Sequence, residues 1–145
     1  MLLALPLIIV WTGCQRGITT YKVEGTVIYD GQPVSGADIT FHPTVADGHL
    51  GYARTDDQGK FILQTKQGKP GGGTVPGEYV VQIKKMESFA VASKLVGSDG
   101  VARERVEGRN TLPAILGTDK SPIKLIVEKK SMNMFDIDLS SYPTK

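Results

Sequence analysis

Residues 29–43, YDGQPVSGADITFHP, decide the fold class, because they join two stretches in which apolar residues recur at every second position. Before this segment, the alternating positions are Val23, Gly25, Val27 and Tyr29. At its end, they are Ala37, Ile39 and Phe41. A period of two places the apolar residues on one face of a β-strand, which predicts two strands with one buried face each.

The residues between the two stretches are those of a tight turn. Asp30 and Gly31 supply backbone with positive φ, and Pro33 restricts the chain that follows. Gly36 permits a sharp return before Ala37. A second turn, TDDQGKF at residues 55–61, has aspartates that accept local backbone N–H groups and a glycine suited to left-handed backbone.

The same alternation recurs along the chain, and turn residues separate the runs. The candidate strands cover residues 22–30, 37–43, 50–55, 60–65, 78–85, 122–129 and 134–140. A chain of 145 residues is long enough for one domain. We therefore expect an all-β fold, an antiparallel Greek-key sandwich of about seven strands.

Residues 86–121 break this regular spacing. They include SFAVASKLV and VARERVEGRN, and the latter concentrates arginine and glutamate in a short span. We expect an irregular insertion here. Two alternatives remain for it: a functional or flexible loop, or a crossover with its own hairpin whose charges are solvated.

Composition argues against several function classes. The formal charge is only +2 and no basic run is interleaved with aromatic residues, so we expect no nucleic-acid partner. A single cysteine allows no internal disulfide. Loop aspartates and two histidines lack the spacing of calcium or zinc ligands, so no metal or other cofactor is expected. These residues are Asp30, Asp47, Asp56, Asp57, His42 and His49.

No catalytic set is evident in the sequence either. No Gly-x-Ser-x-Gly motif occurs, and neither histidine has a marked partner. Lys22 with Asp136 or Asp138 could nominally form an isopeptide between the first and last strands, but the aspartates alternate outward. We expect a protein that is not an enzyme.

The first residues carry a different signal. Residues 1–11 are almost wholly apolar, which is too short for a spanning helix and typical of the core of a secretory signal. Thr12, Gly13 and Cys14 follow, and this order resembles the lipobox of bacterial lipoproteins. The resemblance implies a signal peptide over residues 1–13, lipid attachment at Cys14 through diacylglycerol and an acyl chain such as palmitate, and a tether over residues 14–20. Multiple acyl chains anchor stably to a membrane.

A second resemblance involves the turns of the domain. Three motifs, GQPVSGA at 31–37, TDDQGKF at 55–61 and PGEY at 76–79, are similar to those of the carboxypeptidase regulatory-like, transthyretin-like family of bacterial envelope sandwiches. LPAILGTDKSPIKLIVEK and FDIDL, further along, resemble a small-lipoprotein branch of it. The resemblance implies a transthyretin-like sandwich over residues 21–142. The enzymatic branch of that fold, which hydrolyses 5-hydroxyisourate, has a Tyr-Arg-Gly-Ser motif where this chain reads SSYPTK.

Together these observations predict a non-catalytic, lipid-anchored cell-envelope protein that faces the periplasm or the exterior. It would serve as a structural or adhesive binding module, with an envelope protein or polysaccharide as partner. The alternative is a carbohydrate-binding or enzyme-accessory module, in which residues 86–121 and the glycine-rich loop 68–73 form one ligand surface.

Overall fold

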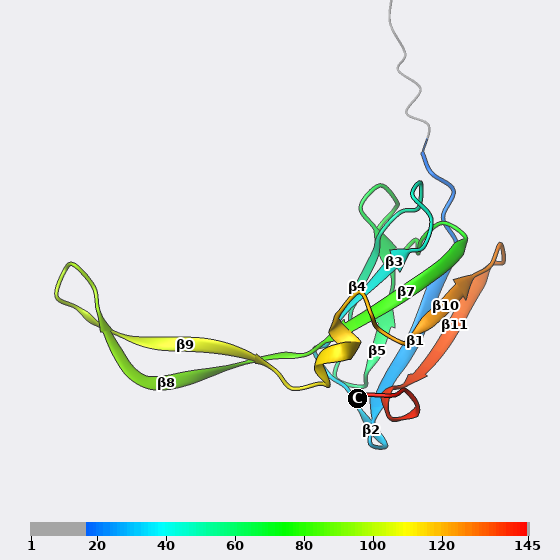
Figure 1. Ribbon diagram of the computed structural model, residues 1–145. Coiled ribbons are helices and arrows are strands. Elements are labelled where there is room, and N and C mark those ends of the chain that lie inside the picture. The colour runs from blue at the N-terminus through cyan, green and yellow to red at the C-terminus, as the bar shows by residue number, and fades with distance from the viewer. Residues whose placement is uncertain (1–16, 145) are drawn as a thin grey trace, which may run out of the picture.

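Two β-sheets pack face to face, and a long two-stranded ribbon projects from one end of them (Figure 1). The computed structural model describes residues 17–144, with the backbone alone for residues 92–95 and 102–105. The first sheet has the order β11-β1-β2, with β5 also paired to β1. It contains β1 (Lys22–Tyr29), β2 (Gln32–Pro33), β5 (Lys60–Ile62) and β11 (Met132–Asp138).

The second sheet has five strands in the order β10-β7-β3-β4-β6. They are β3 (Asp38–Pro43), β4 (Gly51–Arg54), β6 (Gln64–Thr65), β7 (Gly77–Lys84) and β10 (Lys124–Val127). The helical elements of the described residues are two short 3-10 turns, η1 (Ala114–Gly117) and η2 (Leu139–Ser141). Neither of these turns approaches the length and apolar character that a membrane-crossing helix requires, and residues 17–144 contain no other helix.

The core lies between the sheets and confirms the predicted alternation. On β3, Ile39 and Phe41 are buried, whereas Asp38, the first residue of the strand, is exposed and Thr40 is partly buried. β1, β7 and β11 follow the same pattern, with the buried residues Val23, Val27, Tyr79, Val81, Ile83 and Ile137. The prediction of an all-β sandwich is therefore confirmed, since alternate residues of both sheets face one apolar layer.

Aromatic rings fill the centre of this layer. The ring of Phe41 lies with its centroid 5.8 Å from that of Tyr79 and 6.3 Å from that of Phe61. Gly25 on β1 lies beneath the Phe61 ring, and a Cβ at this position would also collide with the carbonyl of Phe135. Glycine within a strand here permits the close approach of neighbouring chain and ring.

The predicted turns form as expected. Asp30 and Gly31 have φ of 50° and 74°, as a two-residue turn between β1 and β2 requires. In the second turn, one carboxylate oxygen of Asp56 accepts the N–H groups of Gln58 and Lys60, each at 2.9 Å. Gly59 has φ of 73°.

One strand pair departs from the expected antiparallel pattern. β1 and β11 run parallel, with Lys22 paired to Met132 and Ile28 to Asp138. β11 follows β10 along the chain but belongs to the opposite sheet, so the chain crosses between the two layers at residues 128–131. The fully antiparallel expectation is corrected at this pair.

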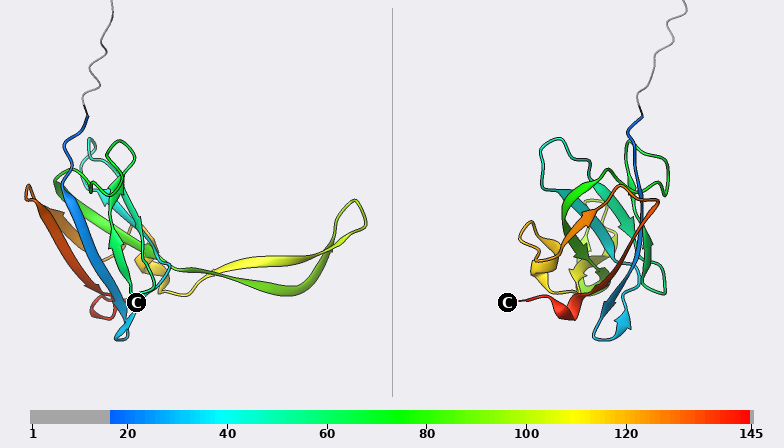
Figure 2. Two further views of the ribbon diagram at one scale, coloured as in Figure 1. Left: turned by 180° about the vertical axis from the view of Figure 1, so that it is seen from behind. Right: turned by 90° about the vertical axis from the view of Figure 1, so that its right-hand side faces the viewer.

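Residues 86–121 are not the irregular insertion that was expected. Most of them form β8 (Met86–Val96) and β9 (Ala102–Asn110), an antiparallel pair that forms its own sheet. This pair, here called the ribbon, extends away from the sandwich in Figure 1 and in the left-hand view of Figure 2. Of the two alternatives left by the sequence, the hairpin is therefore correct, and the remaining residues return through η1 to β10.

Candidate functional site

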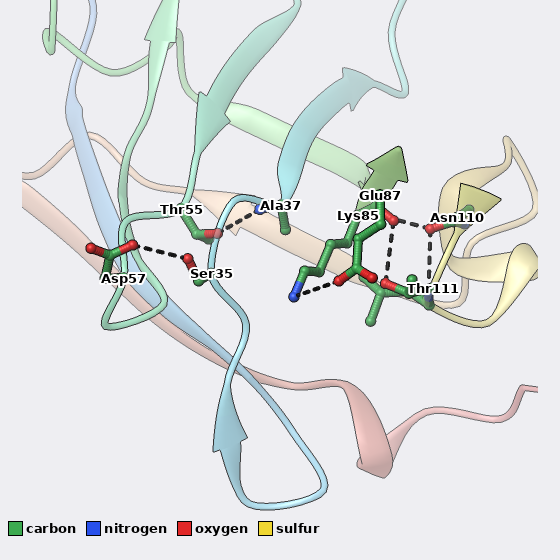
Figure 3. Close-up of polar contacts among 9 residues, drawn as sticks. Ser35, Ala37, Thr55, Asp57, Lys85, Glu87, Asn110 and Thr111 are labelled. Carbon is green, nitrogen blue, oxygen red and sulfur yellow. Dashed lines mark hydrogen bonds and ion pairs between the residues drawn. The ribbon is translucent and has the colours of Figure 1, made fainter. Parts of the chain in front are cut away.

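The ribbon leaves the sandwich through a hydrogen-bonded root (Figure 3). The Oδ1 atom of Asn110 accepts the N–H of Lys85 at 3.1 Å and the N–H of Leu112 at 3.2 Å. Thr111 donates its N–H to the carbonyl of Lys85 at 2.9 Å. Leu112 then enters the core, where it is buried. One amide side chain thus joins the first residue before β8 to the chain that follows β9.

An ion pair lies beside this root. The Nζ of Lys85 is 3.3 Å from Oε1 of Glu87, and both side chains are partly solvated (Figure 3). Exposed pairs of this kind contribute little to stability because water and salt screen them. Its role is therefore local orientation of the first residues of β8.

Both faces of the ribbon carry apolar side chains that the sandwich does not cover. Met86 is 51% exposed and Phe89 is 45% exposed on β8, and Val106 on β9 is 64% exposed. Met86 and Val106 lie on one face and Phe89 on the other, because paired residues share a face and the period is two. Each face of the ribbon thus exposes at least one large apolar side chain near its root.

A cleft of about 670 Å³ lies where the ribbon meets the sandwich. One wall is the sandwich residue Tyr29, and Phe89 and Arg109 contribute from the ribbon. The cleft combines two aromatic rings with hydrogen-bonding side chains and one guanidinium. The complete lining consists of Tyr29, Glu87, Ser88, Phe89, Arg109, Asn110, Thr111, Leu112 and Pro113.

The far end of the ribbon is closed by an ordered turn. Gly97 donates its N–H to the carbonyl of Val101 at 3.1 Å, and Oδ1 of Asp99 accepts the N–H of Val101 at 3.1 Å. Val96 and Val101 flank this turn and are 68% and 53% exposed. Among its described residues, the ribbon therefore exposes apolar side chains both near its root and at its tip.

The predicted lipid-attachment residue, Cys14, lies outside the described residues, as do the signal peptide over 1–13 and the first part of the 14–20 tether. The described chain begins at Gly17 and joins the first sheet at β1.

The loop carboxylates of Asp30, Asp56 and Asp57 bond to nearby hydroxyl and backbone N–H groups. Asp30 accepts a hydrogen bond from the hydroxyl of Ser140 at 3.2 Å, Asp57 accepts one from Ser35 at 3.2 Å, and Asp56 organises its own turn. The Nδ1 of His49 lies 3.4 Å from the amide oxygen of Gln67. Within residues 17–144, no group of three or more carboxylate, histidine or cysteine side chains is placed to hold a metal ion.

The structure does not bring the nominal isopeptide partners together. Lys22 is paired with Met132, whereas Asp136 is paired with Thr26, four positions further along β1. That offset corresponds to roughly 13 Å along a strand. The carboxylate of Asp136 instead accepts a hydrogen bond from the hydroxyl of Thr26 at 2.7 Å.

The glycine-rich loop 68–73 and the ribbon do not form one surface, which corrects the expectation for the alternative function. Gly73 donates its N–H to Leu63, and Tyr21 pairs with Thr74, so the loop lies at the start of β1. The ribbon root lies beside Tyr29, the last residue of β1. An eight-residue strand separates the two.

The sequence left a hairpin as one of two alternatives for residues 86–121, because this segment has no sustained apolar alternation. The segment GSDG at residues 97–100 is a turn signal that favours the hairpin. Charged residues at positions 103, 105, 107 and 109 recur with a period of two, although Glu104 interrupts the pattern.

Comparison with known proteins gives three findings. Residues 23–86 match a family model described as a domain of unknown function, DUF6795. This match extends from β1 to the first residue of the ribbon. No curated protein matches the sequence.

Among solved structures, the chain is similar to a 9R-lipoxygenase from Cyanothece PCC8801, with a TM-score of 0.40 and 10% sequence identity. The similarity covers 86% of this chain and 17% of the lipoxygenase chain. The chain thus spans about a sixth of that protein.

Proposed function

We propose that this protein is a lipid-anchored cell-envelope module without catalytic activity, whose ribbon is its contact element. Cys14 would carry the lipid and residues 14–20 would form the tether. The sandwich would then be a rigid spacer between the membrane and the ribbon. The sequence around Cys14 and the resemblance to transthyretin-like envelope sandwiches support this proposal.

The observation that carries the proposal is the placement of the ribbon relative to the start of the domain. The chain enters β1 at Lys22, and Tyr29 at the other end of that strand lines the cleft at the ribbon root. An eight-residue strand spans about 26 Å. A lipid attached ahead of Lys22 would therefore hold the ribbon root at the end of the sandwich that is distant from the membrane (Figure 1).

The ribbon is also dispensable for the core. The buried apolar residues are drawn from the sandwich strands and their connections, and none of the described side chains in residues 86–110 is among them. Apolar side chains that stabilise no core, and are exposed instead, support a role in contact with another molecule. An adhesive or structural role in the envelope fits this arrangement.

A carbohydrate-binding or accessory role is the second candidate, and the cleft at the ribbon root favours it. Tyr29 and Phe89 could stack on sugar rings, while Arg109 offers hydrogen-bond donors. A screen against polysaccharides and peptidoglycan fragments separates the candidates. A purely structural module binds none of them, and a carbohydrate-binding module loses its ligand on substitution of Phe89→Ala.

Metabolic labelling with an alkyne fatty acid tests the anchored function. Wild-type protein is expected to take up label and remain in the membrane fraction, whereas Cys14→Ser is expected to lose both properties. Intact mass of the mature protein would show cleavage between Gly13 and Cys14. Wild-type protein that takes up no label and leaves the membrane fraction contradicts the proposal.

A further inference from the structure

The outer edge of β8 is an open template for another strand. In the described part of the chain, β8 pairs with β9 and with no other strand. Its second edge therefore presents a row of backbone N–H and C=O groups to solvent. Such edges bind further strands unless charge, proline or a covering segment prevents it.

The two edges of the ribbon differ in how many charged residues oppose pairing with another strand. In sequence, β9 carries charged residues at five of its positions, Arg103, Glu104, Arg105, Glu107 and Arg109. β8 carries only Glu87 and Lys94, with the uncharged segment SFAVAS between them at residues 88–93. Charged edges resist pairing, and residues 88–93 contain neither a charge nor a proline that would oppose it. By charge, the less protected edge is therefore that of β8, whose pairing with β9 is irregular between Val91 and Lys94.

The ribbon gains from additional strands. A two-stranded hairpin without a packed face is marginally stable in water, whereas a sheet of three or more strands can be stable by itself. Met86 and Phe89 are both about half exposed. A further strand paired with β8 would place neighbouring side chains beside each of them, on the face of the sheet that each occupies.

We propose that this edge binds the same edge of a second copy of the chain. Two β8 strands would run antiparallel about a two-fold axis, giving a four-stranded sheet in the order β9-β8-β8-β9. An isologous contact of this kind requires one self-complementary surface. The midpoint of β8 is Val91, and the regular stretch Met86–Val91 precedes the register shift between Val91 and Lys94.

The charges of the ribbon are compatible with a second copy of the chain as its partner. Glu87 lies near the root end of β8 and Lys94 towards the tip, so antiparallel pairing places opposite charges at each end of the interface. Across residues 86–110, acidic and basic residues are equal in number: Glu87, Asp99, Glu104 and Glu107 against Lys94, Arg103, Arg105 and Arg109. Two ribbons therefore meet without net repulsion.

The inference rests on the proposed role of the ribbon as contact element and names its partner. A pairing of one strand edge is small for a protein interface, so we expect a weak dimer whose population depends on concentration. Attachment of both copies to one membrane would raise their effective concentration and favour pairing.

Sedimentation velocity over a concentration series tests the proposal, using the full chain as the Cys14→Ser variant so that no lipid contributes to association. Two further substitutions form a matched pair, because Ala90 on β8 and Val106 on β9 are register partners on the same face. Ala90→Lys is expected to raise the dimer dissociation constant by about tenfold or more, since the two introduced lysines then lie diagonally opposite each other, on one face, across the two-fold axis. Val106→Lys, one strand further from the contact, is expected to leave it within about threefold.

Three results would overturn the inference: a monomer at every concentration, an equal effect of the two substitutions, or no effect of Ala90→Lys. Amide hydrogen exchange gives a second readout that does not depend on the variants, because β8 amides should gain protection as concentration rises. Loss of self-association leaves lipid labelling and membrane fractionation unchanged, so failure here is distinguishable from failure of the proposed anchoring.

Discussion

Tyr79 lies at the centre of the core and carries a hydroxyl group that needs a hydrogen-bond partner there. Its ring is buried against Phe41, and its hydroxyl donates to the carbonyl of Val75 at 2.8 Å and lies 3.1 Å from the hydroxyl of Thr74. Burial raises the pKa of the phenol above the ordinary value of 10.0, and the hydrogen bond with Thr74 opposes this shift in part. The native state therefore favours the neutral phenol.

Replacement Tyr79→Phe is expected to lower the free energy of unfolding by about 1 kcal/mol at pH 7, because the carbonyl and hydroxyl partners lose their bond. Because the pKa of Tyr79 is higher in the folded than in the unfolded state, the neutral phenol also contributes to the free energy of unfolding. This contribution is complete below the unfolded-state pKa and is lost as the pH rises through the folded-state pKa. The stability difference between wild type and Tyr79→Phe should therefore shrink above about pH 10.

Urea denaturation at several pH values measures this difference. Tyr52→Phe, at an exposed position on β4, is the matched control and should change stability little at pH 7. A difference that grows with pH would contradict the assignment.

At the scale of elements, the root of the ribbon depends on one side chain. The N–H groups of Lys85 and Leu112 both donate to the side-chain oxygen of Asn110. Asn110→Ala removes both bonds and should destabilise the root by about 1–3 kcal/mol. Asn110→Asp keeps an acceptor oxygen and serves as the control.

Amide hydrogen exchange at Lys85 and Leu112 measures this effect directly. Exchange should accelerate in Asn110→Ala and much less in Asn110→Asp, while amides in β3 and β7 stay protected. Equal protection of these two amides in wild type and Asn110→Ala would argue against the capping role.

The elements also show what sequence can predict. Strands such as β3 and β7 were predictable because one face is buried, so Ile39, Phe41, Val81 and Ile83 alternate with polar residues. No described side chain of β8 or β9 is buried, so burial imposes no apolar period on these parts of the strands. The parallel pairing of β1 with β11 was not predictable, since alternation reports which face a residue occupies and not which strand lies beside it.

For the candidate site, a local pattern of neighbouring residues was enough to propose lipid attachment at Cys14, which lies outside the described residues. The cleft at the root is not local: Tyr29 reaches it from β1, whereas Phe89 and Arg109 reach it from the ribbon. Such a site becomes visible only when the strands are placed.

At the scale of the whole molecule, the sandwich and the ribbon are separable. Replacing residues 86–110 by Asn-Gly should give a folded sandwich, because Lys85 and Thr111 are already joined by a backbone hydrogen bond of 2.9 Å and Asn-Gly suits a two-residue hairpin. The midpoint of thermal unfolding is expected to fall by less than about 10 °C, because no described side chain of the excised residues is in the core and the main cost is the loss of the two hydrogen bonds to Asn110.

Thermal unfolding followed by circular dichroism checks this expectation, with the full chain as reference. The shortened chain should also fail to self-associate in sedimentation velocity. A shortened chain that is unfolded at room temperature would mean that the ribbon contributes to the sandwich after all.

The parallel pairing of β1 with β11 has a consequence for the order of events during synthesis. Thr26 and Asp136 are hydrogen-bonded neighbours although 110 residues separate them in sequence. At ribosomal rates of about 5–20 residues per second, β1 waits roughly 5–20 s for its last neighbour. Contacts of such long range slow folding. The first sheet therefore cannot be completed until translation of the chain is nearly finished.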